Sequence, residues 1–229
     1  MNLFKKIDLR IFLLILRSKY IYQVVSKRLN RKFGISRRIG GALWGGEKDP
    51  YHKKNYPPGA HGTLGYRKTT EYGSQLIAKQ KLKMYYGDIR EKQFKAIYMT
   101  AKRRRGDTGE NLIGLLESRL DAFLYRSKFA PTVFSSRQFV SHKHVRVNKK
   151  IVNIPSYSLR VNDVVELADT VRRSSLILQS IADRNREVPE YINADGSHFK
   201  SIFLRMPTLK DVPFPVEMQP NLVIEFYSR

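Results

Sequence analysis

The sequence has no cysteine among its 229 residues, which excludes several kinds of site. Without thiols there are no disulfides, no thiolate metal sites such as zinc knuckles, and no cysteine nucleophile. Long apolar runs are also scarce: the run from Ile11 to Leu16 is far shorter than the ~20 residues that span a bilayer. The surrounding segment has no small-residue cleavage site and little serine, so we expect neither a membrane span nor a targeting peptide.

Motifs for bound nucleotides are missing as well. The stretch "GGALWGG" does not fit the pattern G-x-G-x-x-G, and G-x-x-x-x-G-K-[ST] does not occur. His142 and His144 are spaced to share one face of a strand, but no third ligand is evident near them, which favours RNA contact or a plain surface role over a metal site. We therefore expect no cofactor, no metal and no small-molecule substrate.

What the sequence has in excess is positive charge. It contains 43 Lys and Arg against 20 Asp and Glu, a formal net charge of +23. Residues 25–105 carry 21 of the basic and 5 of the acidic residues, hence +16 of the total. This segment should contact a polyanion most densely, with an affinity that falls steeply as salt rises. The alternative, a solvated basic face without a partner, is less favoured because self-repulsion on this scale opposes a compact state.

The first part of this basic segment, residues 26–73, is rich in Gly, Pro, Lys and Arg and keeps no period of 2 or 3.6. We interpret it as an irregular arm that takes its shape on a partner. Helical spacing begins at residues 72–87, where Gly87 is placed to end a helix. Asp88 and Glu91 have the spacing of a capping box for a second helix, which closes in a basic turn.

A longer helical pattern follows. Residues 110–129 have apolar side chains at i, i+3 and i+4 and predict one continuous helix. Thr132 is expected to cap a short helix after it. Toward the C-terminus we expect one more helix over 171–184 and a strand-like end over 221–229.

Between these helices the pattern changes to three short strands. On a half-buried sheet Val145 and Val147 point inward, so Arg146 points outward, near the basic residues of the next turn. The sheet would then present one basic face. Neighbouring polar side chains able to bond sugar or base edges suit shaped RNA better than the groove of duplex DNA.

The sequence "NLIGLLESRLDAFLYRSKFAPTVFSSRQFVSHKHVRVNKKIVNIPSYSLRVNDVVEL" resembles the RNA-binding module of the bacterial-type small-subunit ribosomal protein four family. The stretches "SKRLNRKFGISRRIGGALWG", "PPGAHG", "EYGSQLIAKQKLKMYYGDIREKQF" and "VIEFYSR" are also similar to that family, so the resemblance extends over residues 25–229. It implies an α+β fold: a helical RNA-binding domain with an inserted small α/β module of two helices plus a small antiparallel sheet, and an irregular basic N-terminal arm. The implied divisions are an extension (1–24), the arm and helical rRNA-binding domain (25–111), the module (112–181), and a C-terminal segment packing back on the helical domain (182–229).

The resemblance also implies a function. Such a protein is a non-enzymatic, structural constituent of the small ribosomal subunit that binds the five-prime domain of its rRNA early and nucleates assembly. It lies beside small-subunit ribosomal protein five, near the channel through which messenger RNA (mRNA) enters, and contributes to translational accuracy there. By the same resemblance Arg67 and Lys68 are the candidates for facing mRNA. The implied location is a cytoplasmic bacterial ribosome, with an organellar ribosome as the second possibility.

Three positions depart from the family pattern. Lys149 stands where the family often has Gly after Asn, and a two-residue hairpin would force this lysine to a positive φ at a cost of ~1 kcal/mol, so we expect a wider turn. Ala60 replaces the usual Gln of "PGQHG", which removes one polar contact of the arm. Val25 stands where family chains begin with Met, so we hypothesise that translation starts there; peptides from the first 24 residues in the purified native protein would refute this.

The charge pattern and the resemblance together predict an RNA-binding set from the arm, the helices and the module. Its members are Lys27, Arg28, Arg31, Lys32, Arg37, Arg38, His61, Lys79, Lys81, Lys83, Arg103, Arg104, Arg105, Arg137, Ser141, His142, Lys143, His144, Arg146, Asn148, Lys149 and Lys150.

Two other function classes stay open. The motif "SRLD" ending at Asp121 resembles that of pseudouridine synthases, some of which carry a similar module, but the chain lacks their large catalytic domain. A free RNA chaperone or translational repressor would use the same contacts as the ribosomal protein, and sequence does not separate the two.

Overall fold

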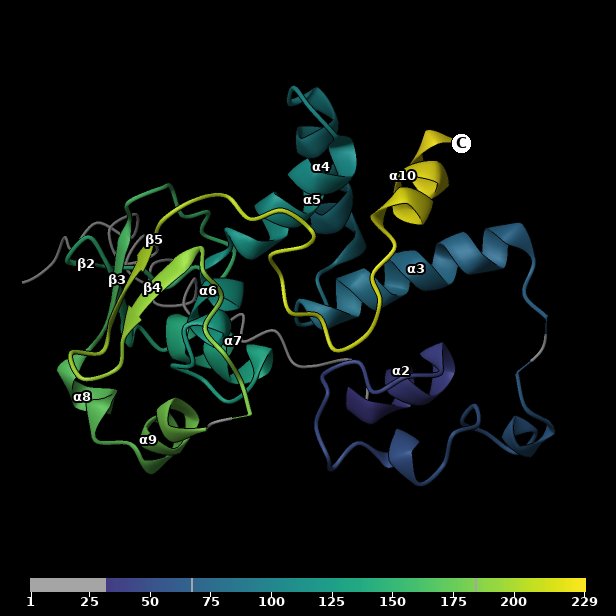
Figure 1. The fold of residues 1–229 in the computed structure, drawn as a ribbon, viewed down its shortest axis with the longest axis horizontal. Helices are drawn as coiled ribbons and strands as arrows, with labels where there is room; N and C mark the ends of the chain where they lie inside the picture. Colours follow the sequence, from purple (N-terminus) through teal and green to yellow (C-terminus); the bar gives the residue numbers. More distant parts are fainter. Residues whose placement is uncertain (1–31, 67, 184) are drawn as a thin grey trace, which may run out of the picture.

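The computed structural model describes residues 32–66, 68–183 and 185–229 as two lobes. Figure 1 shows a sheet lobe with helices α6 to α9, a helical lobe with α2, α3 and α10, and α4 and α5 between them. The helices are α2 (Lys32–Ile39), α3 (Glu71–Tyr85), α4 (Glu91–Arg103), α5 (Thr108–Glu117), α6 (Leu120–Arg126), α7 (Val133–Ser141), α8 (Asp169–Arg172), α9 (Ser175–Ala182) and α10 (Pro220–Ser228), with 3-10 turns η1 (Pro50–His52) and η2 (Gly62–Leu64). The strands are β1 (Val145–Val147), β2 (Lys150–Ile151), β3 (Val164–Leu167), β4 (Ile192–Asp195) and β5 (Lys200–Phe203). The expected α+β fold is confirmed.

The sheet is larger than the sequence predicts. Its order is β2-β1-β3-β5-β4, and every neighbouring pair is antiparallel. Strands β4 and β5 come from the segment that was expected to pack back on the helical domain, yet β5 pairs with β3. Without them β3 would be an open edge with unpaired backbone groups. The predicted boundary after residue 181 therefore cuts through the sheet, and only the chain beyond β5 returns to the helical lobe.

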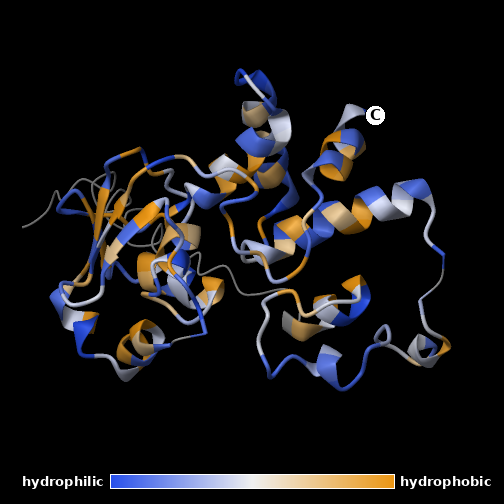
Figure 2. Ribbon diagram, viewed as in Figure 1, coloured by the Kyte–Doolittle hydropathy of each residue, from blue (hydrophilic) through white to orange (hydrophobic). Residues whose placement is uncertain are grey.

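The apolar faces of the sheet and of the helices beside it form the core of this lobe. Val145 and Val147 are buried as the alternation of β1 predicts, and Arg146 between them is half-buried. Phe203 of β5 meets Phe123 of α6 edge-on, with ring centroids 5.9 Å apart. Figure 2 shows hydrophobic residues along the strands and a hydrophilic free end of α4.

The continuous helix expected over residues 110–129 is broken into α5 and α6. At the break the backbone N–H of Leu120 donates to the carbonyl of Tyr157 (2.9 Å), and that of Asp121 donates to Pro155 (3.1 Å). The N–H of Leu159 returns a bond to the carbonyl of Ser118 (2.8 Å). Because these partners come from a loop about 40 residues away, the helical pattern alone could not reveal the break. The helix expected over 171–184 is likewise divided, into α8 and α9.

Two predicted ends differ and two are confirmed. Helix α3 ends at Tyr85, and Gly87 follows it with φ of 80°, as expected. The capping box at Asp88 is wrong: this residue has φ of 57°, and α4 begins after Arg90. The strand expected over 221–229 is helix α10, which starts at Pro220, a favoured first helical residue. The cap at Thr132 is confirmed, since the N–H of Ser135 donates to its hydroxyl (3.1 Å).

The arm is more ordered than expected, because part of it packs on the protein itself. Leu43 is fully buried in the core. The indole N–H of Trp44 donates to the carbonyl of Tyr85 (3.3 Å), and its ring lies 5.7 Å from that of Phe134. Helix α2 forms where no sustained period was visible. The predicted extension 1–24 and the adjoining residues up to 31 lie outside the described residues.

A buried ionic cluster joins the two lobes. The carboxylate of Glu117, at the end of α5, is fully buried and receives hydrogen bonds from the guanidinium of Arg126 (2.9 Å from Nη2) and from the phenols of Tyr86 (2.7 Å) and Tyr191 (2.9 Å). Arg126 also donates to the carbonyl of Pro213 (3.1 Å). Burial, followed by the nearby Glu117 charge, raises the pKa of both tyrosines, so the phenols stay protonated donors. Four segments of the chain depend on this one carboxylate.

The turn between β1 and β2 is the two-residue hairpin turn that the lysine was expected to prevent. Val147 pairs with Lys150, and the residues between them, Asn148 and Lys149, have φ of 48° and 66°. Positive φ at both central residues is the geometry of a type I′ turn, for which Asn-Gly is preferred. The expectation of a wider turn is wrong, and Lys149 bears the strain.

Replacing Lys149 with Gly should therefore raise the free energy of unfolding by up to about 1 kcal/mol, less the entropy that glycine adds to the unfolded chain. Urea unfolding measures this change. Lys150→Gly is the matched control, because Lys150 lies in a strand and its replacement should lower stability. A Lys149→Gly protein no more stable than its parent would contradict the strain.

Candidate nucleic-acid interface

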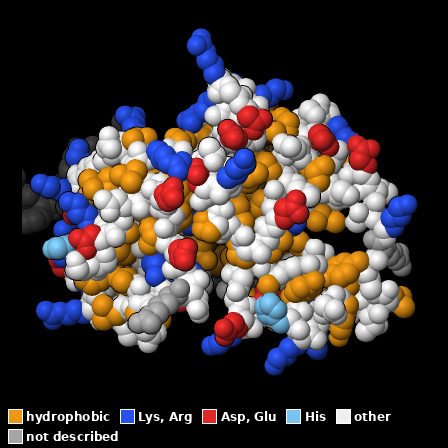
Figure 3. Space-filling view, viewed as in Figure 1, with side chains coloured by type: hydrophobic (Ala, Val, Ile, Leu, Met, Phe, Trp, Pro, Cys, Tyr) orange, Lys and Arg blue, Asp and Glu red, His pale blue; other side chains and the backbone are white. Residues whose placement is uncertain are grey.

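A dense group of exposed basic residues stands at the free end of α4. Arg103 ends the helix, and Arg104 and Arg105 follow it, all three exposed. The carbonyl of Arg105 accepts a hydrogen bond from the side-chain amide of Asn111 (3.1 Å), which ties the turn to α5. Figure 3 shows Lys and Arg side chains projecting at this end of the molecule, at the top of the view. The predicted cations thus form a protruding basic tip.

The hairpin between β1 and β2 forms a second basic point. Lys149 and Lys150 are exposed. Asn148, predicted to bond RNA, is used inside the protein: its amide donates to Asp163 (2.8 Å), and its oxygen accepts from the N–H of Val164 (2.9 Å). These bonds hold the strained turn against β3. The side chain of Asn148 therefore positions the two lysines.

Arg146 lies farther back on the sheet. It is half-buried, and its Nη1 lies 3.8 Å from the carboxylate of Asp169. The arginine forms a long ion pair with an exposed carboxylate, so its charge is shared between this carboxylate and solvent. Its outward direction is as expected from the alternation of β1.

The turn from α7 into β1 gathers the next predicted residues. The backbone N–H of Lys143 donates to the carbonyl of Val140 (2.9 Å), and that of His144 donates to the carbonyl of Phe139 (3.0 Å). This way of ending a helix requires a residue in the left-handed conformation, and Lys143 has φ of 64°. Ser141, His142 and Lys143 are exposed and His144 is half-buried.

The two histidines of this turn stay close to each other. Their ring centroids are 5.9 Å apart. Burial, and then the neighbouring His142, lower the pKa of His144, so this ring is neutral at pH 7. Among the described residues no group of three or more His, Asp or Glu gathers in metal-binding geometry.

Several predicted cations bond within the protein. The ammonium of Lys79 is nearly buried and lies 2.8 Å from Glu91, whose other oxygen lies 3.4 Å from Lys83. Lys81 donates to the carbonyl of Glu217 (3.1 Å), and Arg37 donates to those of Tyr56 (3.0 Å) and Pro57 (3.2 Å). Lys79 and Lys83 join α3 to α4, Lys81 joins α3 to the C-terminal segment, and Arg37 joins α2 to the arm. Sequence spacing did not show these internal partners, and contact of these side chains with RNA stays a prediction.

Arg137 also turns inward. Its guanidinium donates to the carbonyl of Gly87, and its Nε lies 3.7 Å from Asp121. Burial lowers its pKa, partly opposed by the charge of Asp121. The residue joins α7 to the loop after α3.

Three further predicted residues lie in the described part of the arm. Arg38, His61 and Lys68 are exposed. Lys27, Arg28, Arg31 and Arg67 lie outside the described residues, as does the side chain of Lys32.

Sequence reasoning missed a row of cations on α4. Lys92, Lys95 and Lys102 of α4 are exposed, outside the face that buries Phe94, Tyr98 and Ala101, and they lead to the basic tip. The sequence does carry a signal for these lysines. When one face of a helix is buried, the residues between its apolar positions must face solvent.

The candidate nucleophile Asp121 is fully buried and already neutralised. Its two oxygens accept hydrogen bonds from Nε (3.0 Å) and Nη2 (2.6 Å) of Arg119. A carboxylate that is buried and ion-paired in this way cannot reach a nucleobase of an RNA substrate. None of the helices in the described ranges has the length and apolar content needed to cross a bilayer.

Comparison with known proteins agrees with this arrangement. A family model described as the ribosomal protein S4/S9 N-terminal domain matches residues 27–117, and the S4 domain model matches residues 118–165. The small ribosomal subunit proteins uS4 of Bartonella bacilliformis and Gluconobacter oxydans are 55% and 54% identical to this chain over 205 residues. That of Azorhizobium caulinodans is 51% identical over the same length. Each alignment covers 90% of this chain and all of the relative.

Proposed function

The chain belongs to the uS4 family of small ribosomal subunit proteins, and from this premise we propose that it binds small-subunit rRNA as a structural, non-enzymatic component of the ribosome. The observation that carries the proposal is the separation of its cations. Those at the tip of α4 and on the β1–β2 hairpin are exposed, while others are used to join helices. A rigid frame with phosphate-binding points on its surface suits a shaped RNA.

An RNA-modifying enzyme is not supported by the site. Asp121 is buried and ion-paired with Arg119, and the relatives are structural ribosomal proteins. The motif "SRLD" instead closes the junction between α5 and α6. The chain is therefore a structural protein rather than a catalyst.

The finer parts of the function remain proposals. We propose that the rRNA target is the five-prime domain, bound early so that it nucleates assembly, and that small-subunit ribosomal protein five is a neighbour. Exposed Lys68 is the described candidate for contact with mRNA where it enters, and hence for an effect on accuracy. The ribosome would be that of a bacterial cytoplasm, as for the named bacterial relatives, with an organellar ribosome as the second source.

The domain division is also part of the proposal. We keep the start of the RNA-binding module near residue 112 and move its end beyond β5, because β4 and β5 complete its sheet. The remaining C-terminal segment, ending in α10, belongs with α3 in the helical lobe.

Cell fractionation separates a ribosomal component from a free RNA chaperone or repressor. The full chain is expected to sediment with small subunits and to stay with them through a high-salt wash. Recovery mainly in the ribosome-free fraction would argue for the chaperone.

A further inference from the structure

A cleft of about 270 Å³ lies between α4 and the loop that follows β2. Residues Gln93, Ala96, Ile97 and Thr100 line it from α4, and Leu115 from α5. The α4 residues recur at i, i+3, i+4 and i+7, so one helix face forms a whole wall. Phe94, Tyr98 and Ala101 of α4 are buried in the core, whereas Ala96 and Thr100 of the wall are exposed and Ile97 packs on the core only in part.

The opposite wall is held firmly by the break between α5 and α6. Ser156 and Ser158 line it, and the hydroxyl of Ser158 lies 3.2 Å from that of Ser118. Arg119 forms an isolated bridge with Ser158 and also lines the cleft. The backbone hydrogen bonds that split the helix therefore fix the shape of the cleft in advance.

The lining combines an apolar floor with polar groups at the edge. Ala96, Ile97 and Leu115 are apolar. The amide of Gln93 and the hydroxyl of Ser156 have no hydrogen-bond partner among the described residues. An amide offers both donors and an acceptor, which matches the edge of a nucleobase, while its flat face suits the apolar wall.

The charge around the cleft suits an anionic chain. At its back, the carboxylate of Asp121 lies between the guanidiniums of Arg119 (2.6 Å) and Arg137 (3.7 Å), so the buried group keeps a net positive charge. Exposed Arg90 and Arg103 stand before and at the end of α4. Cations at both ends of the lining face can bind phosphates of the RNA chain whether or not a base enters the cleft.

We propose that this cleft binds one unpaired nucleobase of the rRNA, between the face of α4 that bears Ala96 and Ile97 and the loop 155–159. The inference rests on the proposed RNA-binding function and adds a base-binding site to its phosphate contacts. The volume is just below the ~300 Å³ at which small-molecule sites begin, so the cleft suits a single base better than a cofactor. RNA recognition commonly uses unstacked bases of this kind.

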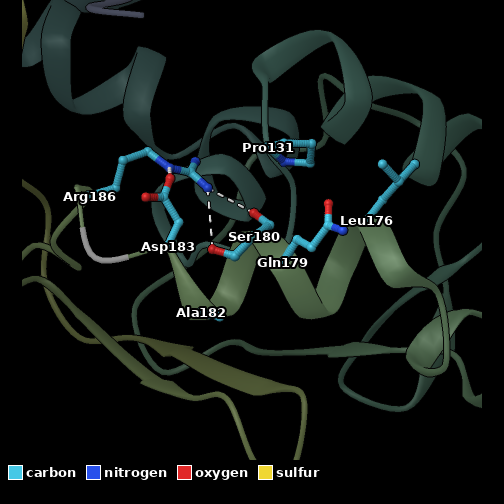
Figure 4. Close-up of a pocket in the computed structure, with 7 residues that line it drawn as sticks. All are labelled: Pro131, Leu176, Gln179, Ser180, Ala182, Asp183 and Arg186. Atoms are coloured by element: carbon cyan, nitrogen blue, oxygen red, sulfur yellow. Dashed lines mark hydrogen bonds and ion pairs between the residues drawn. The ribbon is translucent and has the colours of Figure 1, made fainter. Parts of the chain in front are cut away.

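A second cleft differs in its charge, because its arginine is bonded within the protein and a carboxylate stands at its rim. It is larger, about 420 Å³, and is lined by α9 and by Pro131 (Figure 4). Its cation, Arg186, bonds Asp183 (3.2 Å), the hydroxyl of Ser180 (2.7 Å) and the carbonyl of Ala130 (3.1 Å). Asp183 adds a carboxylate to the rim. This cleft is a natural control.

Ala96→Trp in the full chain fills the proposed site, and Ala182→Trp makes the same change in the control cleft; both alanines are exposed. The probe is a five-prime-domain fragment of small-subunit rRNA, with binding measured across a range of salt concentrations. Ala96→Trp should weaken binding at least fivefold, because a stacked base contributes roughly 5- to 150-fold. Its salt dependence should equal that of the parent, since no phosphate contact is lost. Ala182→Trp should bind like the parent.

Gln93→Ala is a second, smaller change that removes the unpartnered amide. It should weaken binding by about two- to tenfold, again without altering the salt dependence. Thermal unfolding confirms that each variant is folded.

The base-binding site is overturned if Ala96→Trp and Gln93→Ala bind as tightly as the parent, or if Ala96→Trp weakens binding no more than Ala182→Trp. A reduced salt dependence in Ala96→Trp would also overturn it, because lost phosphate contacts would then explain the effect. Failure of the proposed function is distinguishable, since the parent itself would then not prefer this fragment over unrelated RNA.

Discussion

Glu117→Gln is expected to lower the free energy of unfolding by about 3–5 kcal/mol. The substitution leaves the guanidinium of Arg126 buried without a carboxylate, and breaking one member of a buried ion pair costs this much because the remaining charge is uncompensated. The phenols of Tyr86 and Tyr191 also lose a charged acceptor. Chemical denaturation measures the change.

Glu110→Gln is the matched control for this prediction. Glu110 is in the same helix, α5, but is exposed, so its replacement should change stability by about 0.5 kcal/mol or less. A Glu117→Gln protein within about 1 kcal/mol of its parent would contradict the role of the cluster in joining the lobes.

Replacing Arg103, Arg104 and Arg105 together with Gln is expected to weaken binding to small-subunit rRNA by roughly two orders of magnitude at 0.1 M salt. Each arginine that touches a phosphate adds about 0.7–0.9 to the slope of log affinity against log salt. The triple variant should therefore lose about 2–3 from that slope. Filter binding at several salt concentrations gives both numbers.

A charge-matched control replaces Lys200, Arg205 and Lys210 with Gln. These residues lie on and after β5, and Arg205 already pairs with Asp211 (2.6 Å). The control should lose little affinity and keep most of the slope. Equal losses in the two triple variants would mean that net charge, rather than the tip of α4, determines binding.

Local patterns in the sequence predicted the elements that depend on local physics. The cap at Thr132 and the burial of Val145 and Val147 follow from residues a few positions apart, and both are confirmed. The break between α5 and α6 depends on hydrogen bonds to residues 155–159, and α10 depends on packing against α3. Such long-range partners leave no local signal. One continuous helix was therefore predicted where α5 and α6 form, and a strand was predicted where α10 forms.

The candidate interface shows the same difference between features set by nearby residues and features set by distant partners. Exposure of Arg103 and of Lys149 follows from their positions at a helix end and a hairpin tip. Lys79 looked equally suitable, but Glu91 of the next helix faces it and draws it into the protein. Counting cations therefore does not distinguish those that are exposed from those that bond within the protein, and which of them contact RNA stays a prediction.

Equilibrium binding to a five-prime-domain fragment of small-subunit rRNA tests the central claim most directly. The full chain would be titrated at several salt concentrations, with an unrelated structured RNA of equal length as competitor. We predict preferential binding to the fragment with a steep salt dependence. Equal affinity for the two RNAs would contradict the account, since the charge of +23 would then act without discrimination.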